Sequence, residues 1–153
     1  MLNVLISLLG CDELGFKPSP MVTDTASDTI GIDVLEPKGN MVIDIGGGTT
    51  EIAVISLGGI VCDKSIRVAG DEFTANIKTY MKTRHNIAVG DIMAENIKIN
   101  VGSALTELEE PPANYPVHGR DLMSGIPKEV IVTYKEIAGA LNNSIEQIEE
   151  AVM

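Results

Sequence analysis

A run of three glycines between two apolar stretches is the feature of this sequence best suited to chemistry. The segment reads MVIDIGGGTTEIAVISLGG over residues 41–59. Successive glycine N–H groups in a turn can point into one concavity, whose partial positive charge attracts phosphate without a cationic side chain. An aspartate before the run could hold a hydrated Mg²⁺ or orient a water, and two threonines after it offer hydroxyl donors. These candidate site residues are Asp44, Gly46, Gly47, Gly48, Thr49 and Thr50.

A plain tight turn is the alternative interpretation of the glycine run. Glycine reaches positive φ without steric cost, so any tight hairpin accommodates it. The run lacks the lysine of a Walker loop and does not open a helix, so neither the P-loop nor the dinucleotide fingerprint fits. Taken alone, the glycines leave both interpretations open.

The composition is that of a globular protein with an acidic surface. The 153 residues are 44% hydrophobic and 22% charged, and 11 basic against 22 acidic residues give a formal charge of −11. Nucleic acid is excluded as a predicted partner, because neutralising phosphates needs a basic face. A nucleotide remains compatible if backbone N–H groups, a cation or a few lysines supply the positive charge.

The first forty residues carry few structural signals. The apolar start MLNVLISLLGC resembles a lipoprotein cleavage box, but no Lys or Arg precedes it and it is too short to span a bilayer. We expect a buried strand or a docked terminus there, followed over residues 10–40 by a weakly structured lead-in. Cys11 and Cys62 lack the spacing of a metal or redox motif, so both are predicted to be reduced thiols.

Three strands in antiparallel succession are predicted after this lead-in. The runs MVIDI, EIAVISL and IVCDKSIRV are rich in β-branched residues. Gly58-Gly59 offers a two-residue turn between the second and third runs, and Leu57 is expected on the same face as Ile55. This pattern indicates a meander rather than a βαβ unit.

Helices dominate the predicted second half. Residues 71–85 show helical spacing of apolar residues, with acids in the first turn and bases in the last. A second helix should run from near Asp91 to Gly102. After a proline-rich stretch of loops and edge strands and one strand over residues 128–133, a last helix opens with the capping box Thr133-x-x-Glu136 and ends without a C-cap.

Four segments in order carry a resemblance to a known family. They read DIGGGTTEIAVISLGGIV, RVAGDEF, AENIKINVG and GRDLMSGIPKEV. The chain resembles the MreB family of bacterial actin homologues, within the superfamily of actin, sugar kinases and DnaK-type chaperones. The implied fold class is mixed α/β: part of a ribonuclease-H-like actin-type ATPase lobe with an inserted small α/β subdomain. We therefore predict a lead-in over residues 1–40, a partial lobe over 41–88 and the inserted subdomain over 89–153.

The resemblance also implies roles for individual residues. Asp44 through Thr50 match the family's second phosphate loop, which would grip the β- and γ-phosphates of ATP while Asp44 assists Mg²⁺ through water. Glu51 falls near the attacking water. The remaining matches lie at a turn and helix start lining the nucleotide cleft and on a helix that would hold adenosine: Gly70, Asp71, Glu72, Glu95 and Lys98. Without the family match, Glu95 and Lys98 would be interpreted as an exposed ion pair of little energetic value.

Three elements of the family pattern are missing from this sequence. It shows neither the first phosphate loop nor the later adenine-side loop, so we expect this chain alone to bind ATP weakly or not at all. The family's catalytic carboxylate, in a Glu-Pro dipeptide, is also missing. Asp24 occupies the corresponding position, counted from Ile30-Gly31, within a stretch (MVTDTAS) that does not resemble the motif.

Three functions are compatible with these observations. The first is an ATP-binding, filament-forming protein that sets bacterial rod shape, cytoplasmic or membrane-associated, with homo-oligomers and, by resemblance, inner-membrane and cell-wall synthesis proteins as partners. The second is a stand-alone ATPase or sugar kinase of the same superfamily, for which the sequence shows no sugar pocket. The third is an interaction fragment that does not hydrolyse ATP.

Overall fold

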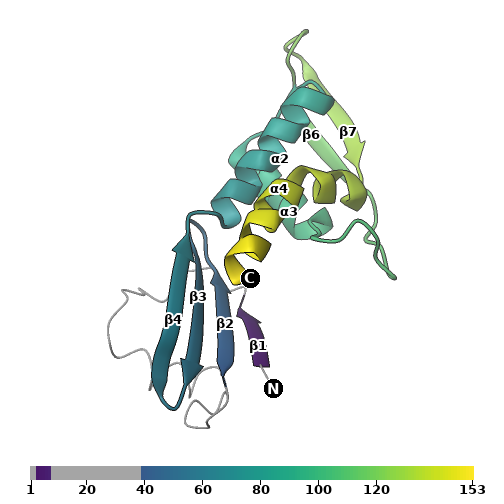
Figure 1. The fold of residues 1–153 in the computed structure, drawn as a ribbon. Helices are drawn as coiled ribbons and strands as arrows, with labels where there is room; N and C mark the ends of the chain where they lie inside the picture. The colour runs from purple at the N-terminus through teal and green to yellow at the C-terminus, as the bar shows by residue number, and fades with distance from the viewer. Residues whose placement is uncertain (1–2, 8–38) are drawn as a thin grey trace. The chain divides into compact units, whose positions relative to one another are not determined.

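The computed structural model describes residues 3–7 and 39–153, which form two compact units (Figure 1). The first contains the described residues up to Gly70 together with Glu150–Met153, and the second is Asp71–Glu149. This division differs from the predicted boundary at residue 88. The reason is that the helix after Gly70 places Ile77 and Met81 in the core of the second unit.

A four-stranded sheet makes up most of the first unit. Its strands are β1 (Asn3–Ser7), β2 (Asn40–Ile45), β3 (Thr50–Ser56) and β4 (Gly59–Ile66), in that order across the sheet. The β2–β3 and β3–β4 pairs are antiparallel, which confirms the predicted meander. At the other edge β1 pairs in parallel with β2, so the apolar start of the chain does form a strand.

The turn between β3 and β4 lies one residue earlier than predicted. Ser56 pairs with Gly59, and the two turn residues are Leu57 (φ 51°) and Gly58 (φ 73°). Positive φ at both central positions is typical of a type I′ turn, whose twist matches that of the flanking strands. Leu57 is accordingly 67% exposed instead of sharing the buried face with Ile55, so that part of the prediction was wrong.

The second unit packs three helices with a small antiparallel sheet. The helices are α2 (Gly70–Arg84), α3 (Asp91–Val101) and α4 (Tyr134–Val152), and the strands β5 (Ile87–Ala88), β6 (Tyr115–Asp121) and β7 (Pro127–Val132) lie in the order β5-β6-β7. One hydrophobic core joins these elements: Ile77, Met81, Ile87, Val89, Ala94, Ile97, Val101, Val117, Val132, Tyr134, Ile137 and Leu141.

The predicted helix boundaries of this unit follow from local chemistry. Helix α3 runs from Asp91 to Val101 and is capped by the amide of Gly102, which donates to the carbonyl of Lys98. A Cβ at Gly102 would lie 2.2 Å from that carbonyl oxygen, so a side chain would clash there. The capping box of α4 is confirmed, since the amide of Thr133 donates to Glu136 Oε2 (2.9 Å) and the amide of Glu136 to Thr133 Oγ1 (3.4 Å).

The end of α4 differs from the prediction. We expected the helix to end without a cap, but Lys64 Nζ donates a hydrogen bond to the carbonyl of Ala151 at 3.2 Å. A lysine at this position satisfies one of the carbonyls that a helix leaves unpaired at its C-terminus. The two residues are 87 positions apart in the sequence, so no local pattern could have indicated this bond.

Candidate functional site

The glycine run forms the turn between β2 and β3. The amide of Gly46 donates to the carbonyl of Thr49 (2.9 Å), and the carbonyl of Gly46 accepts from the amide of Gly70 (3.0 Å). Within the described part of the chain, the amides of Gly47 and Gly48 form no hydrogen bond, and both residues are exposed. The turn therefore leaves two glycine amides available to a ligand, whereas the sequence predicted three.

The backbone of this turn also indicates why glycine is needed. Among the glycines that the structure describes, positive φ occurs at Gly58 and Gly125 and at none of the three in the run. Left-handed backbone geometry is thus not the reason for these glycines. A glycine has no side chain, so the backbone at the exposed Gly47 and Gly48 is open to close approach by another molecule.

The two threonines after the glycines have different environments. Thr49 is exposed beside the open amides, as a hydroxyl donor to a ligand should be. Thr50 is fully buried, and its hydroxyl donates to the carbonyl of Val68 at 2.6 Å. Its hydroxyl proton is therefore used within the protein, and the contact of Thr50 with a ligand stays a prediction.

Asp44 lies at the end of β2, directly opposite Glu51 on β3. Opposed residues of an antiparallel pair share a face of the sheet, so the two carboxylates extend from the same side. Asp44 Oδ1 is buried without a hydrogen-bond partner, and burial raises the pKa of this carboxyl above its ordinary value. A buried carboxylate oxygen with no partner is the type of ligand that Mg²⁺ binds, and this site fits that ion.

A second group of predicted residues is joined by polar contacts between α2 and α3. Lys98 Nζ lies 2.8 Å from Glu95 Oε2 and donates to Thr74 Oγ1 at 3.1 Å, while the Thr74 hydroxyl is 2.9 Å from Glu95 Oε2. The hydrogen bond from Lys98 lowers the pKa of Glu95, with a smaller contribution from Thr74. Because the Lys98 side chain is only 22% exposed, this network is more than the surface ion pair that the residues alone suggested.

An open groove of about 570 Å³ lies beside this network. Both Asp71 and Glu95 line it, together with Thr74, so the structure brings these predicted residues to one surface. Glu72 is exposed but does not line the groove. Sequence analysis missed Thr74, although its position three residues after Asp71 on the same helix was a usable signal.

The predicted residues thus fall into two groups in different units. Asp44, Glu51 and the glycine turn belong to the first unit, and Asp71, Glu72, Glu95 and Lys98 to the second, while Gly70 is the last residue of the first unit before Asp71. Asp24 lies outside the described residues. No set of three or more His, Cys, Asp or Glu side chains within residues 3–7 and 39–153 is arranged to hold a metal ion.

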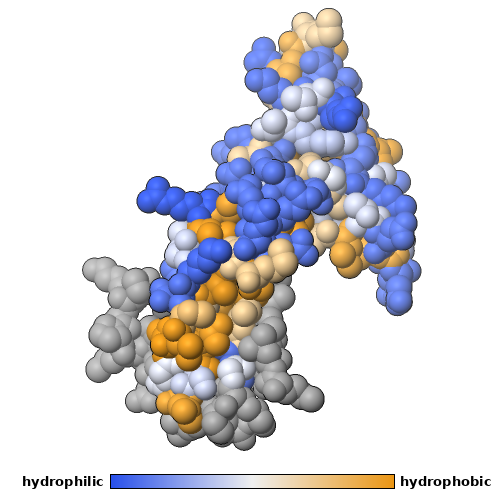
Figure 2. Space-filling model, in the orientation of Figure 1, coloured by the Kyte–Doolittle hydropathy of each residue, from blue (hydrophilic) through white to orange (hydrophobic). Residues whose placement is uncertain are grey.

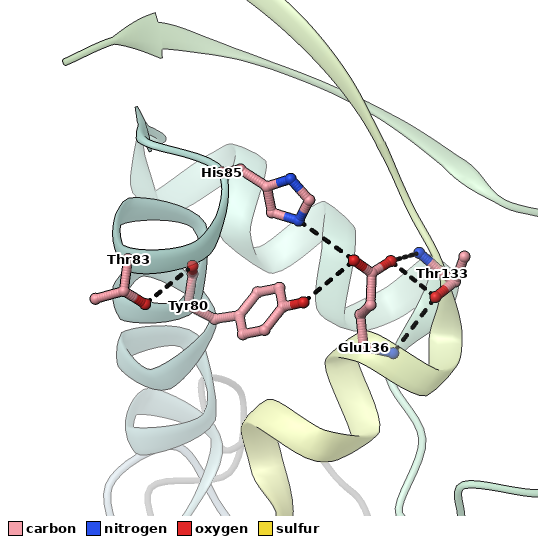
Figure 3. Close-up of polar contacts among 5 residues, drawn as sticks. All are labelled: Tyr80, Thr83, His85, Thr133 and Glu136. Carbon is pink, nitrogen blue, oxygen red and sulfur yellow. Dashed lines mark hydrogen bonds and ion pairs between the residues drawn. The ribbon is translucent and has the colours of Figure 1, made fainter. Parts of the chain in front are cut away.

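A further polar cluster, which the sequence did not predict, surrounds Glu136 (Figure 3). Its Oε1 accepts from the Tyr80 hydroxyl (3.2 Å) and lies 3.4 Å from His85 Nε2, while its Oε2 accepts from the amide and hydroxyl of Thr133. Burial raises the pKa of Tyr80, and the charge and hydrogen bond of Glu136 raise it further. The cluster fixes the end of α2 against the start of α4, which is a structural role.

None of the helices in the described ranges is long and apolar enough to cross a membrane.

Solved structures define the class of protein to which this fold belongs. MreB 5 of Spiroplasma citri bound to AMPPNP superimposes with a TM-score of 0.78 at 39% identity, over 83% of this chain and 38% of that one. MreB5 of Spiroplasma citri bound to ADP superimposes with a TM-score of 0.80 at 33% identity, over 99% of this chain and 50% of that one. The chain therefore has an actin-like ATPase fold of mixed α/β class.

Sequence comparison then gives the family. The model of the MreB/Mbl protein family matches residues 11–153. The cell shape-determining protein Mbl of Bacillus subtilis is 42% identical over 121 residues, which are 79% of this chain and 36% of that protein. The cell shape-determining protein MreB of Escherichia coli is 42% identical over 146 residues, 94% of this chain and 40% of that protein. This chain belongs to the MreB/Mbl family, and it spans less than half the length of these two relatives.

Proposed function

We propose that this chain is a nucleotide-binding part of an actin-like cytoskeletal protein that determines cell shape. Its relatives are named as cell shape-determining proteins, and the S. citri relative was solved with AMPPNP and with ADP. The observation that carries the proposal is the turn between β2 and β3, where the two glycine amides without a hydrogen bond closely follow in sequence Asp44, whose buried carboxylate oxygen has no partner. Hydrogen-bond donors and an acceptor of this kind suit a triphosphate with its cation.

Each group has a distinct role in this proposal. The amides of Gly47 and Gly48 and the hydroxyl of Thr49 bind phosphate oxygens, and Asp44 holds Mg²⁺ through water. When bound, Mg²⁺ would neutralise charge on the phosphates. Glu51, opposite Asp44, orients the water near the terminal phosphate. In the second unit, the groove beside Glu95 and Lys98 takes the nucleoside, with Asp71 at its rim.

Assembly into homo-oligomeric filaments in the cytoplasm is part of the same proposal, with membrane and cell-wall synthesis proteins as partners of the whole assembly. The exposed apolar residues Leu57, Ile60 and Val61 support self-association, since contiguous exposed apolar surface is typical of interaction sites. Figure 2 shows hydrophobic surface, in orange, over part of the first unit. A sugar kinase is not favoured, because the family is that of cell shape-determining proteins.

Calorimetric titration with Mg·ATP tests the proposal. We expect weak binding by the 153-residue chain, loss of that binding in Asp44→Ala, and no robust steady-state hydrolysis. The matched control is Asp63→Ala, which removes an exposed carboxylate from β4 of the same sheet and should leave the affinity unchanged. Equal affinities of wild type and Asp44→Ala would contradict the proposed phosphate site. No binding at all, with co-pelleting on filaments of a longer relative, would instead support the interaction fragment.

A further inference from the structure

Thr50 is a polar residue that is completely buried beside the phosphate-binding turn. It is 0% exposed and forms the first position of β3, where it pairs with Ile45 on one side and Ile66 on the other. Its hydroxyl donates to the carbonyl of Val68 at 2.6 Å, two residues beyond the last residue of β4. A buried hydroxyl is costly unless it is hydrogen-bonded, so this bond is expected to persist in the folded protein.

A second hydrogen bond attaches the other end of the turn to the same segment. The amide of Gly70 donates to the carbonyl of Gly46 at 3.0 Å. Ala69, between the two attachment points, is 1% exposed. Residues 68–70 therefore hold the turn at Gly46, where it begins, and at Thr50, where it ends. The two free amides, of Gly47 and Gly48, lie between these fixed points.

We infer that Thr50 is a positioning residue, which presents the amides of Gly47 and Gly48 to a phosphate group without touching it. The inference rests on the proposed function of the turn. Fixing the backbone before binding avoids the entropy cost of ordering it when the ligand arrives. One of these bonds comes from the amide of Gly70, which is also the first residue of α2.

The sequence pattern gives Thr50 a role that valine could not fill. Threonine and valine have nearly the same shape, and β-branched residues are both favoured at the start of a strand. A residue needed only for packing could be either, but the carbonyl of Val68 requires a donor. Replacing Thr50 by Val therefore removes the hydrogen bond while it keeps the volume.

Three variants of the 153-residue chain test the inference. Thr50→Val removes the hydroxyl, Thr50→Ser keeps the hydroxyl and removes a methyl group, and Thr79→Val is a matched control. Thr79 is exposed on α2, and among the described residues its hydroxyl bonds to the carbonyl of Ala75 alone. Inorganic tripolyphosphate with Mg²⁺ serves as the probe. Its affinity is measured from the amide NMR shifts of Gly47 and Gly48, and the hydrogen exchange rate of the Gly70 amide is measured without ligand.

We expect Thr50→Val to lower the tripolyphosphate affinity about tenfold, the change that corresponds to loss of one good hydrogen bond. Exchange of the Gly70 amide should accelerate in the same variant. Thr50→Ser should restore both values to within about threefold of wild type, and Thr79→Val should change neither. Rescue by serine separates positioning from packing, because serine fills the site less well than valine does.

Several outcomes would overturn the inference. One is a folded Thr50→Val with wild-type affinity and exchange, and another is a Thr50→Ser variant as impaired as Thr50→Val. If Thr50→Val does not fold, wild-type behaviour of Thr50→Ser supports the hydroxyl's role and its failure contradicts it. If the proposed function of the turn is wrong but the inference about Thr50 is right, the measurements give another result. Wild type would not bind tripolyphosphate, while faster Gly70 exchange in Thr50→Val would still show that the hydroxyl holds the turn.

Discussion

The two units of this protein differ in the partners of their buried polar groups. Among the described residues, Asp44 Oδ1 in the first unit and His85 Nε2 in the second are the buried side-chain atoms without a hydrogen bond. His85 Nε2 faces a carboxylate oxygen of Glu136 at 3.4 Å, whereas Asp44 has no ion-pair partner in the described part of the chain. A native fold tolerates such a group mainly where function requires it. In the proposed function the unpartnered oxygen of Asp44 serves the phosphate site, whereas His85 belongs to the cluster that joins α2 to α4.

The second unit has an extensive hydrophobic core, whereas the first unit has an exposed edge strand. The core of the second unit contains side chains from all three helices and all three strands. In the first unit β4 is exposed along most of its length and forms an edge of the sheet. An exposed edge of this kind offers unpaired backbone groups to other chains. Mutations can test whether stability really resides in the second unit.

The largest effect is expected from the core of α3. Ile97 is 0% exposed, and Ile97→Ala should lower the free energy of unfolding by about 2–4 kcal/mol through lost burial and the cavity left behind. The control is Ile99→Ala on the same helix. Ile99 is 72% exposed, so its effect should stay within about 0.5 kcal/mol. Urea denaturation followed by circular dichroism measures both free energies of unfolding. Equal effects of the two substitutions would contradict the burial of Ile97 in the core of the second unit.

A smaller effect is expected at Glu136, which joins α4 to α2. Glu136→Ala removes the capping box and the acceptor of the Tyr80 hydroxyl, and should cost about 1–2 kcal/mol. Glu136→Gln keeps a capping side chain and should cost less. Glu149→Ala, at an exposed position of the same helix, is the control and should be nearly neutral.

The charge of Glu136 also predicts a pH dependence. Burial alone would raise the pKa of this carboxyl, but the hydrogen bonds from Thr133 and Tyr80 and the neighbouring His85 bring it below the ordinary value of 4.5. A lowered pKa means that this stabilisation is present above pH 4.5 and is lost as the pH falls below it. The wild type should therefore lose more stability than Glu136→Gln between pH 5 and pH 3, about the range in which such a carboxyl titrates. Parallel curves would show that the charge is not involved.

Local sequence patterns predicted the structure correctly where it depends on residues close together in the chain. The strands β2 and β3, the end of α3 at Gly102 and the capping box at Thr133 all depend on residues within a few positions of one another. The location of the glycine turn belongs to the same class, because a glycine run between two apolar stretches indicates a turn by itself.

Sequence reasoning failed where the structure depends on contacts between distant segments. The burial of Thr50 depends on Val68, and the cap on α4 depends on Lys64. The turn at Leu57 was misplaced because strand register, rather than the two adjacent glycines, decides which residues adopt positive φ. Pro116 was predicted to lie in a loop or an edge strand, but it lies in β6, the middle strand of its sheet. Proline is tolerated there because β5 pairs with Arg120 and Asp121 and does not extend to Pro116.

The smallest predicted effect has the opposite sign and belongs to the first unit. Because burial raises the pKa of Asp44, its charged form is disfavoured in the folded state. The penalty applies fully above the raised pKa and disappears once the pH falls below the ordinary value of 3.8, where the carboxyl is protonated in both states. Asp44→Asn should therefore stabilise the fold at pH 7, by less than about 1 kcal/mol since the group is only partly buried.

Thermal unfolding of Asp44→Asn at pH 7 and at pH 3.5 tests this sign, with Asp63→Asn as the control at an exposed carboxylate of the same sheet. The gain in stability should be present at the higher pH and absent at the lower one, while Mg·ATP binding is lost. A destabilised Asp44→Asn would mean that the carboxylate has stabilising contacts and that the first unit resembles the second. A stabilised variant without ligand binding would instead show directly that Asp44 is retained for binding at a cost in stability, because no packing requirement would then explain the carboxylate.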